Sequence, residues 1–184
     1  IAWFLDRVCS FLIVEGGTMR PTLNPSPSPR SDICFIWKWN YEPKRGDVVC
    51  LYPSGGQRDS AAVKRVVGIE GDVVVPRHSS PRQVEQKNGH AVLKSEHSRD
   101  GAPLSVVIVP RGHVWVEGDN QFSPVDSNTY GPVPIDRIQG QASRIIFPQD
   151  SSAEGRKLEL ESFIPDPTRV CKSVKTTSEQ ASGN

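Results

Sequence analysis

Short apolar runs that end at proline or glycine are the feature that most constrains the fold of this chain. The sequence contains 16 prolines and 15 glycines, scattered without a fixed period. Proline breaks helices and cannot donate to a β-ladder, while glycine lets the backbone turn, so the pattern disfavours long helices. It predicts a mostly β domain built from many short strands.

Residues 33–39 give the clearest strand pattern. Isoleucine, phenylalanine and two tryptophans occupy alternate positions, and Cys34, Ile36 and Lys38 lie between them. A period of two places these sets on opposite faces of a strand. Further strands are expected over residues 8–14, 48–52, 61–67, 73–75, 106–109, 113–116 and 141–147.

Two segments depart from this pattern. Residues 77–103 are polar and irregular, with one strand expected at 91–94, and we interpret them as a variable insertion. After residue 150 the chain becomes polar, with a short helix expected over 158–164 and a largely disordered tail after 165. The predicted organisation is an opening segment, 1–14, a domain over 15–150, and a tail, 151–184.

The opening segment, residues 1–14, is apolar except for Asp6 and Arg7. A bilayer span needs about 20 apolar residues, so this segment is too short and too charged to cross a membrane alone. Two compatible interpretations stay open. It is the end of a membrane anchor whose helix precedes residue 1, or it is the first core strand.

Composition argues against several function classes. The formal net charge is +1, from 22 basic and 21 acidic residues, which gives no sign of a nucleic-acid partner. The four cysteines form no Cys-x-x-Cys pair and the four histidines are dispersed, so no metal site is expected. The sequence leaves the disulfide question open.

The first cluster that can carry chemistry is residues 14–25. Thr18 follows Gly16 and Gly17 and precedes a proline-rich loop. Glycines allow backbone N–H groups to point at a bound oxyanion. The same pattern is also common in plain turns.

The second cluster, residues 62–72, places Lys64 in an apolar strand. Lysines on strands usually face water. If Lys64 points inward, burial lowers the pKa of its amine, because a low dielectric disfavours the ammonium form. A neutral amine can then accept a proton from a hydroxyl group.

The third cluster, residues 118–133, is rich in turn formers and contains the carboxylates Asp119 and Asp126. It forms either an elaborate surface loop or a loop that braces a site.

The order of these clusters resembles the conserved motifs of the type I signal peptidase family (S26). The motifs are Gly-x-Thr-Met-x-Pro-Thr-Leu from Gly16, Lys-Arg-Val-Val-Gly-x-x-Gly-Asp from Lys64, and Gly-Asp-Asn-x(5)-Asp-Ser-x(3)-Gly-Pro-Val from Gly118. Within the family, residues 4–8, 23–25 and 126–128 most resemble subunit 2 of the mitochondrial inner membrane peptidase. The resemblance covers roughly residues 4–148.

The resemblance implies a signal-peptidase/LexA-like β-fold and a hydroxyl–lysine dyad without metal or cofactor. Thr18 matches the nucleophile and Lys64 the general base, and the backbone N–H of Thr18 matches an oxyanion donor. The positions that match supporting residues are Gly16, Gly17, Met19, Pro21, Ser123 and Asp126.

Two positions depart from the family pattern. The nucleophile is usually serine, and the methyl group of Thr18 stiffens its side chain and crowds the scissile carbonyl. Pro124 occupies the place of a serine that orients the lysine, although Ser123 is adjacent. Retained proteolysis and a weakened or inactive subunit that stabilises a partner peptidase therefore both stay open. A non-enzymatic LexA-like β-domain is disfavoured, since the chain has no DNA-binding helices.

The resemblance also implies a location and partners. It implies a membrane anchor ahead of residue 1 in the mitochondrial inner membrane, with the catalytic domain in the intermembrane space. The implied partners are the leader peptides of precursor proteins, inner membrane lipid and the other peptidase subunit.

Overall fold

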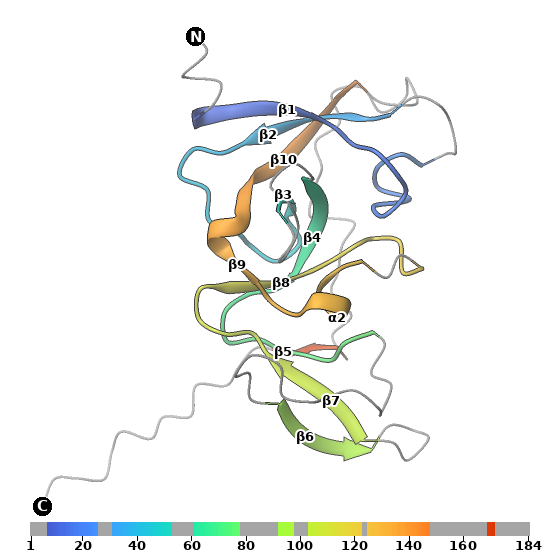
Figure 1. Cartoon of the computed structure of the whole chain (residues 1–184), viewed down its shortest axis with the longest axis vertical. Helices are drawn as coiled ribbons and strands as arrows, with labels where there is room; N and C mark the ends of the chain where they lie inside the picture. The colour runs from blue at the N-terminus through green and yellow to red at the C-terminus, as the bar shows by residue number, and fades with distance from the viewer. Residues whose placement is uncertain are drawn as a thin grey trace, which may run out of the picture.

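The computed structural model describes residues 7–25, 31–52, 61–77, 92–97, 103–122, 125–147 and 169–171. They form two antiparallel sheets, of seven and four strands (Figure 1). The larger sheet has the order β1-β2-β10-β3-β4-β8-β9. Its strands are β1 (Cys9–Ile13), β2 (Ile33–Trp37), β10 (Ile138–Phe147), β3 (Val48–Leu51), β4 (Ala62–Gly68), β8 (His113–Glu117) and β9 (Val133–Pro134).

The smaller sheet lies at the end of the molecule opposite to β1 (Figure 1). Its strands, in spatial order, are β11 (Val170–Cys171), β5 (Val73–Val74), β7 (Pro103–Ile108) and β6 (Val92–His97). Two short helical turns, α2 (Ser127–Tyr130) and η1 (Ile135–Arg137), connect β8, β9 and β10. The sequence-based prediction of a mostly β fold is therefore confirmed.

Every strand expected from the apolar runs is present, with ends that differ by a few residues. The strand expected at 91–94 is β6, so the polar insertion contributes to the smaller sheet. The apolar runs did not predict α2 or β9. A two-residue strand has no period of its own and is defined only by its partner, here His113 and Val114 of β8.

Residues 169–171, in the tail that is expected to be largely disordered after residue 165, contain the short strand β11, which the sequence did not predict. Val170 and Cys171 pair with Val74 and Val73, and the backbone N–H of Val75 donates to the carbonyl of Arg169 at 2.8 Å. This strand is fixed by β5, which lies far away in the sequence, so local composition could not reveal it. The helix expected over 158–164, the rest of the tail and residues 1–6 lie outside the described residues.

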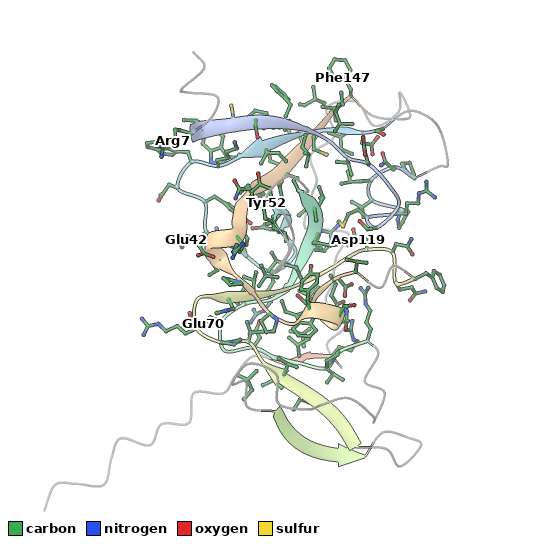
Figure 2. The ribbon with its side chains drawn as sticks, viewed as in Figure 1. Arg7, Glu42, Tyr52, Glu70, Asp119 and Phe147 are labelled. Carbon is green, nitrogen blue, oxygen red and sulfur yellow. The ribbon has the colours of Figure 1, made fainter. Side chains whose placement is uncertain are left out.

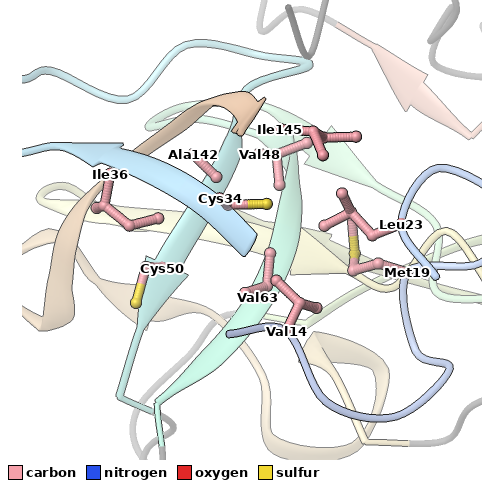
Figure 3. Packing of buried hydrophobic residues seen from close by; sticks show 10 residues of the cluster. All are labelled: Val14, Met19, Leu23, Cys34, Ile36, Val48, Cys50, Val63, Ala142 and Ile145. Atoms are coloured by element: carbon pink, nitrogen blue, oxygen red, sulfur yellow. The ribbon is translucent and has the colours of Figure 1, made fainter. Parts of the chain in front are cut away.

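Three clusters of buried side chains form the core. The first packs between β2, β3, β4 and β10 and is closed by Met19 and Leu23 from the loop that follows β1 (Figure 3). Both side chains are 1% exposed. The loop that carries Thr18 is therefore anchored in the core on its C-terminal side.

The alternation expected in residues 33–39 is also confirmed. Cys34 and Ile36 are buried, whereas Trp37 and Trp39 are exposed, so the aromatic side of this strand faces outward. Phe11 pairs with Phe35 across β1 and β2, with ring centroids 5.7 Å apart, and is 61% exposed. The outer side of β1, β2 and β10 thus carries the exposed apolar side chains of Phe11, Ile13, Trp37 and Phe147, and Trp39 follows just after β2; these five residues are called the apolar face below. Figure 2 labels Phe147 at the end of β10.

No helix in the described part of the chain combines the length and the apolar character needed to cross a bilayer.

Candidate functional site

The loop that carries Thr18 is held by a buried asparagine. The Asn24 amide nitrogen donates to the carbonyls of Val14, at 2.6 Å, and Gly16, at 3.0 Å. Asn24 and Asp32 also exchange two bonds, each from a backbone N–H to the other's side chain, at 2.7 and 2.8 Å. Gly16 has a φ of +79°, which favours glycine. The hydrogen bonds of Asn24 and the conformation of Gly16 therefore fix the bend that precedes Thr18.

Thr18 itself begins a tight turn and is half-buried. The N–H of Leu23 donates to the carbonyl of Met19 at 2.9 Å, which closes the turn. Met19 lies in the core, so it belongs to no exposed surface. Pro21 is exposed, and the peptide bond before it is cis.

Lys64 lies on β4, in the middle of the larger sheet, where it pairs with Val49 of β3. It is 3% exposed, so it does not face water as lysines on strands usually do. Burial lowers the pKa of the Lys64 amine below its ordinary value of 10.5, and the charge of Asp126 opposes this shift only in part. Lys64 therefore points inward, which is the condition under which its amine can be neutral.

The amine of Lys64 and the backbone of Thr18 meet at Gly118, directly after β8. A β-carbon at position 118 would lie 2.5 Å from the carbonyl oxygen of Thr18 and 3.7 Å from Nζ of Lys64. Since real β-carbons do not approach backbone oxygens so closely, glycine is required here for steric reasons. The three motifs that lie apart in the sequence thus come together at one point.

A buried ion pair joins the same three segments. Arg65, 2% exposed, donates from Nε and Nη2 to the two carboxylate oxygens of Asp119, at 2.8 and 2.6 Å. The hydroxyl of Thr22 also donates to Asp119. Sequence reasoning missed Arg65. Two successive basic residues in an apolar strand were the available signal, because neighbours on a strand face opposite sides and both sides of β4 are buried.

Asn120 is a second site residue that sequence reasoning missed. Its backbone N–H donates to the carbonyl of Thr18 at 3.0 Å, and its side-chain amide donates to the carbonyl of Gly17 at 2.9 Å. These two bonds tie the loop after β8 to the turn that presents Thr18. Figure 2 labels Asp119, the residue before Asn120, in this loop.

Asp126 braces the loop from its other end. It caps α2 by accepting from the backbone N–H of Asn128 at 2.9 Å, and it accepts from the N–H of Gly118 at 3.2 Å. It is buried, and its charge acts on Lys64. Ser123 and Pro124 lie outside the described residues.

Within the described ranges, no group of three or more His, Cys, Asp or Glu side chains is placed to hold a metal ion. Cys9, Cys34 and Cys50 are free and buried, and burial raises the pKa of the Cys34 thiol to about 12 and of the Cys50 thiol to about 11. Thiols with raised pKa values carry little thiolate and are poor nucleophiles. The chemistry available at this site is proton transfer by a buried amine beside a residue with a hydroxyl group.

Comparisons with known proteins bear on the family to which this chain belongs. The family model described as signal peptidase, peptidase S26, matches residues 2–147. Subunit 2 of the mitochondrial inner membrane protease from Mus musculus is 36% identical over 88% of this chain and 78% of its own length. The Schizosaccharomyces pombe subunit 2 is 39% identical, over 78% and 67%. Subunit 1 from Mus musculus is 33% identical, over 78% and 72%.

Both the extent of the family match and the identity to these relatives agree with the motif order read from the sequence. The chain belongs to the signal peptidase family, peptidase S26.

Proposed function

We propose that this chain is a membrane-associated signal peptidase that cleaves leader peptides from precursor proteins of the mitochondrial intermembrane space, with Thr18 as nucleophile and Lys64 as general base. One observation carries the proposal. The Lys64 amine is buried, its pKa is lowered, and it lies at Gly118 beside the backbone of Thr18.

In the proposed reaction, neutral Lys64 takes the proton of the Thr18 hydroxyl, and Oγ1 attacks the scissile carbonyl carbon. The C–N bond breaks, and the leaving amine receives the proton from Lys64. The remaining acyl ester on Thr18 is attacked by a water that gives its proton to Lys64. Thr18 then recovers its proton as the carboxyl product leaves. The backbone N–H of Thr18, presented by the bend at Gly16 and Gly17, stabilises the oxyanion.

The precursor is proposed to bind in extended form by adding to a strand edge, as peptides do in β-augmentation. Membrane association is supported by the names of the relatives, which are inner membrane proteases. It is also supported by the exposed aromatic side chains of the apolar face, because tryptophan favours the membrane interface. Relatives named subunit 1 and subunit 2 support a heterodimer with a second peptidase subunit.

The dyad is tested by single-turnover cleavage of a precursor peptide with four proteins: the parent, Thr18→Ser, Thr18→Val and Lys64→Ala. Thr18→Ser should keep or raise the rate, because it retains the hydroxyl and removes the methyl group. Thr18→Val keeps the shape but removes the hydroxyl, and it should lose at least about a hundredfold, as should Lys64→Ala. Cleavage by Lys64→Ala at the parent's rate would exclude the dyad.

A second candidate is a subunit with little or no turnover that stabilises a partner peptidase. The departure of Thr18 from serine favours it. In that case the parent does not cleave on its own, and Thr18→Ser gains activity. The partner peptidase is then less stable when it is purified without this chain. A non-enzymatic β-domain would leave all four proteins inactive and the partner unaffected.

A further inference from the structure

Behind the loop that carries Gly118 lies a buried carboxylate that the proposed chemistry does not use. Glu117, the last residue of β8, is 1% exposed. Its Oε1 accepts from the indole Nε1 of Trp115 at 2.9 Å and from the amide of Asn128 at 3.1 Å. Neutral donors alone do not compensate a buried negative charge, so its cationic partners are essential to this arrangement.

Two arginines, Arg169 and Arg77, supply that charge. Arg169, which follows Glu117 by 52 positions, donates from Nη2 to Oε1 at 2.8 Å and from Nη1 to Oε2 at 3.3 Å. Arg77 reaches Oε2 with Nε at 2.8 Å. Burial raises the pKa of the Glu117 carboxyl, but the hydrogen bonds and charges of its partners outweigh burial, and the pKa lies below its usual value.

Each arginine also holds the backbone around Glu117. Arg77 donates from Nη1 to the carbonyl of Gly118 at 2.9 Å, and its own backbone N–H donates to the side chain of Asn128 at 2.6 Å. Arg169 donates to the carbonyl of Val75 at 3.0 Å, next to β5. The position of Gly118 is therefore fixed in two ways: Arg77 binds its carbonyl, and both arginines bind Glu117, the residue before it.

We propose that Arg169, together with Arg77, is a positioning residue for catalysis, which fixes Gly118 and Asn120 against Thr18 and Lys64 by holding Glu117. The C-terminal segment around β11 is then part of the catalytic core. This inference rests on the proposed function. Displacing reacting groups by about 1 Å can lower the rate about a hundredfold, so even a small shift at Gly118 matters.

The test combines kinetics with hydrogen exchange on the full chain. The variants are Arg169→Gln, Arg169→Lys and the double variant Glu117→Gln/Arg169→Gln, with Arg144→Gln as control, since Arg144 is an exposed arginine on β10. Arg169→Gln should lower kcat about ten- to a hundredfold with KM unchanged. Arg169→Lys should recover part of this loss, because it keeps the charge but not the two-pronged contact. The double variant should lose no more than Arg169→Gln alone.

Amide hydrogen exchange measures how stably the loop with Gly118 and Asn120 is hydrogen-bonded, and it does not depend on turnover. In Arg169→Gln the N–H groups of Gly118 and Asn120, which donate to Asp126 and Thr18, should exchange at least about tenfold faster, while those of β1 and β2 keep the parent's rate. Faster exchange throughout the molecule, or unchanged exchange and kcat, would overturn the inference. A parent without proteolysis would contradict the proposed function, and the exchange pattern would then decide the inference alone.

Discussion

At the scale of single residues, the buried amine of Lys64 links activity to pH. The base must be neutral, so cleavage should rise with pH through the lowered pKa of Lys64 and level off below pH 10.5. In the unfolded chain, the Lys64 amine keeps its proton up to about pH 10.4. Between the two pKa values it therefore binds more protons than the folded protein, and stability rises with pH.

Replacing Lys64 by methionine removes this titration and keeps the volume of the side chain. Lys64→Met should be inactive, yet more stable than the parent at pH 7, because it removes the cost of burying an amine that is charged in the unfolded chain. The difference should shrink as the pH approaches 10. Urea unfolding of both proteins at several pH values measures it. If Lys64→Met were more stable than the parent by the same free energy of unfolding at every pH, burial of the Lys64 amine would not be the cause.

Asn24 permits a matched comparison with Asn40. Both have positive φ, +51° and +45°, but Asn24 is buried and makes the side-chain bonds of the Thr18 loop, whereas Asn40 is exposed. Asn24→Ala should cost about 2–3 kcal/mol more than Asn40→Ala, because it leaves buried groups without partners. Denaturant unfolding measures this. Equal costs would show that backbone conformation alone explains the asparagine at position 24.

At the scale of elements, β4 and the loop after β8 bring the site together. β4 is buried along both sides, so it delivers Lys64 to the Thr18 turn and Arg65 to Asp119 from neighbouring positions. Apolar periodicity predicted this strand. It could not predict that a lysine and an arginine would both be buried, because that depends on the strands and loops packed against each side.

Gly118→Ala tests the close approach of these elements. The added carbon would meet the carbonyl of Thr18, so the backbone must move, and kcat/KM should fall about a hundredfold for a shift of about 1 Å. The control is Gly112→Ala. Gly112 has a φ of +70° and open space around it, so this variant should lose about 1–2 kcal/mol of stability without loss of activity. Parent-like cleavage by Gly118→Ala would exclude a tight contact there.

At the scale of the whole molecule, the apolar face on β1, β2 and β10 is the feature that the core does not explain. Four of its members, Phe11, Ile13, Trp39 and Phe147, are 57–63% exposed. Aromatic side chains gathered on one sheet face suit the boundary between lipid and water. This supports contact with a membrane and defines a direct measurement.

Co-sedimentation with phospholipid vesicles tests that contact. Phe11→Ser/Trp39→Ser should bind about thirtyfold more weakly than the parent, since the two half-buried aromatic rings contribute roughly 1 kcal/mol each. Ile135→Ser, at a side chain that is 38% exposed outside this face, should bind like the parent. Identical binding by all three proteins would exclude the face as the contact.

The sequence by itself determined the β class, most strand positions and the family, because alternation, turn residues and motif order are all local features. It also named Thr18, Lys64 and Asp126. Only the tertiary structure decided that Lys64 is buried, that Gly118 touches the Thr18 turn, and that Arg169 from the tail holds Glu117. These are contacts between segments far apart in the chain, and their free energy depends on burial and charge that no local pattern encodes.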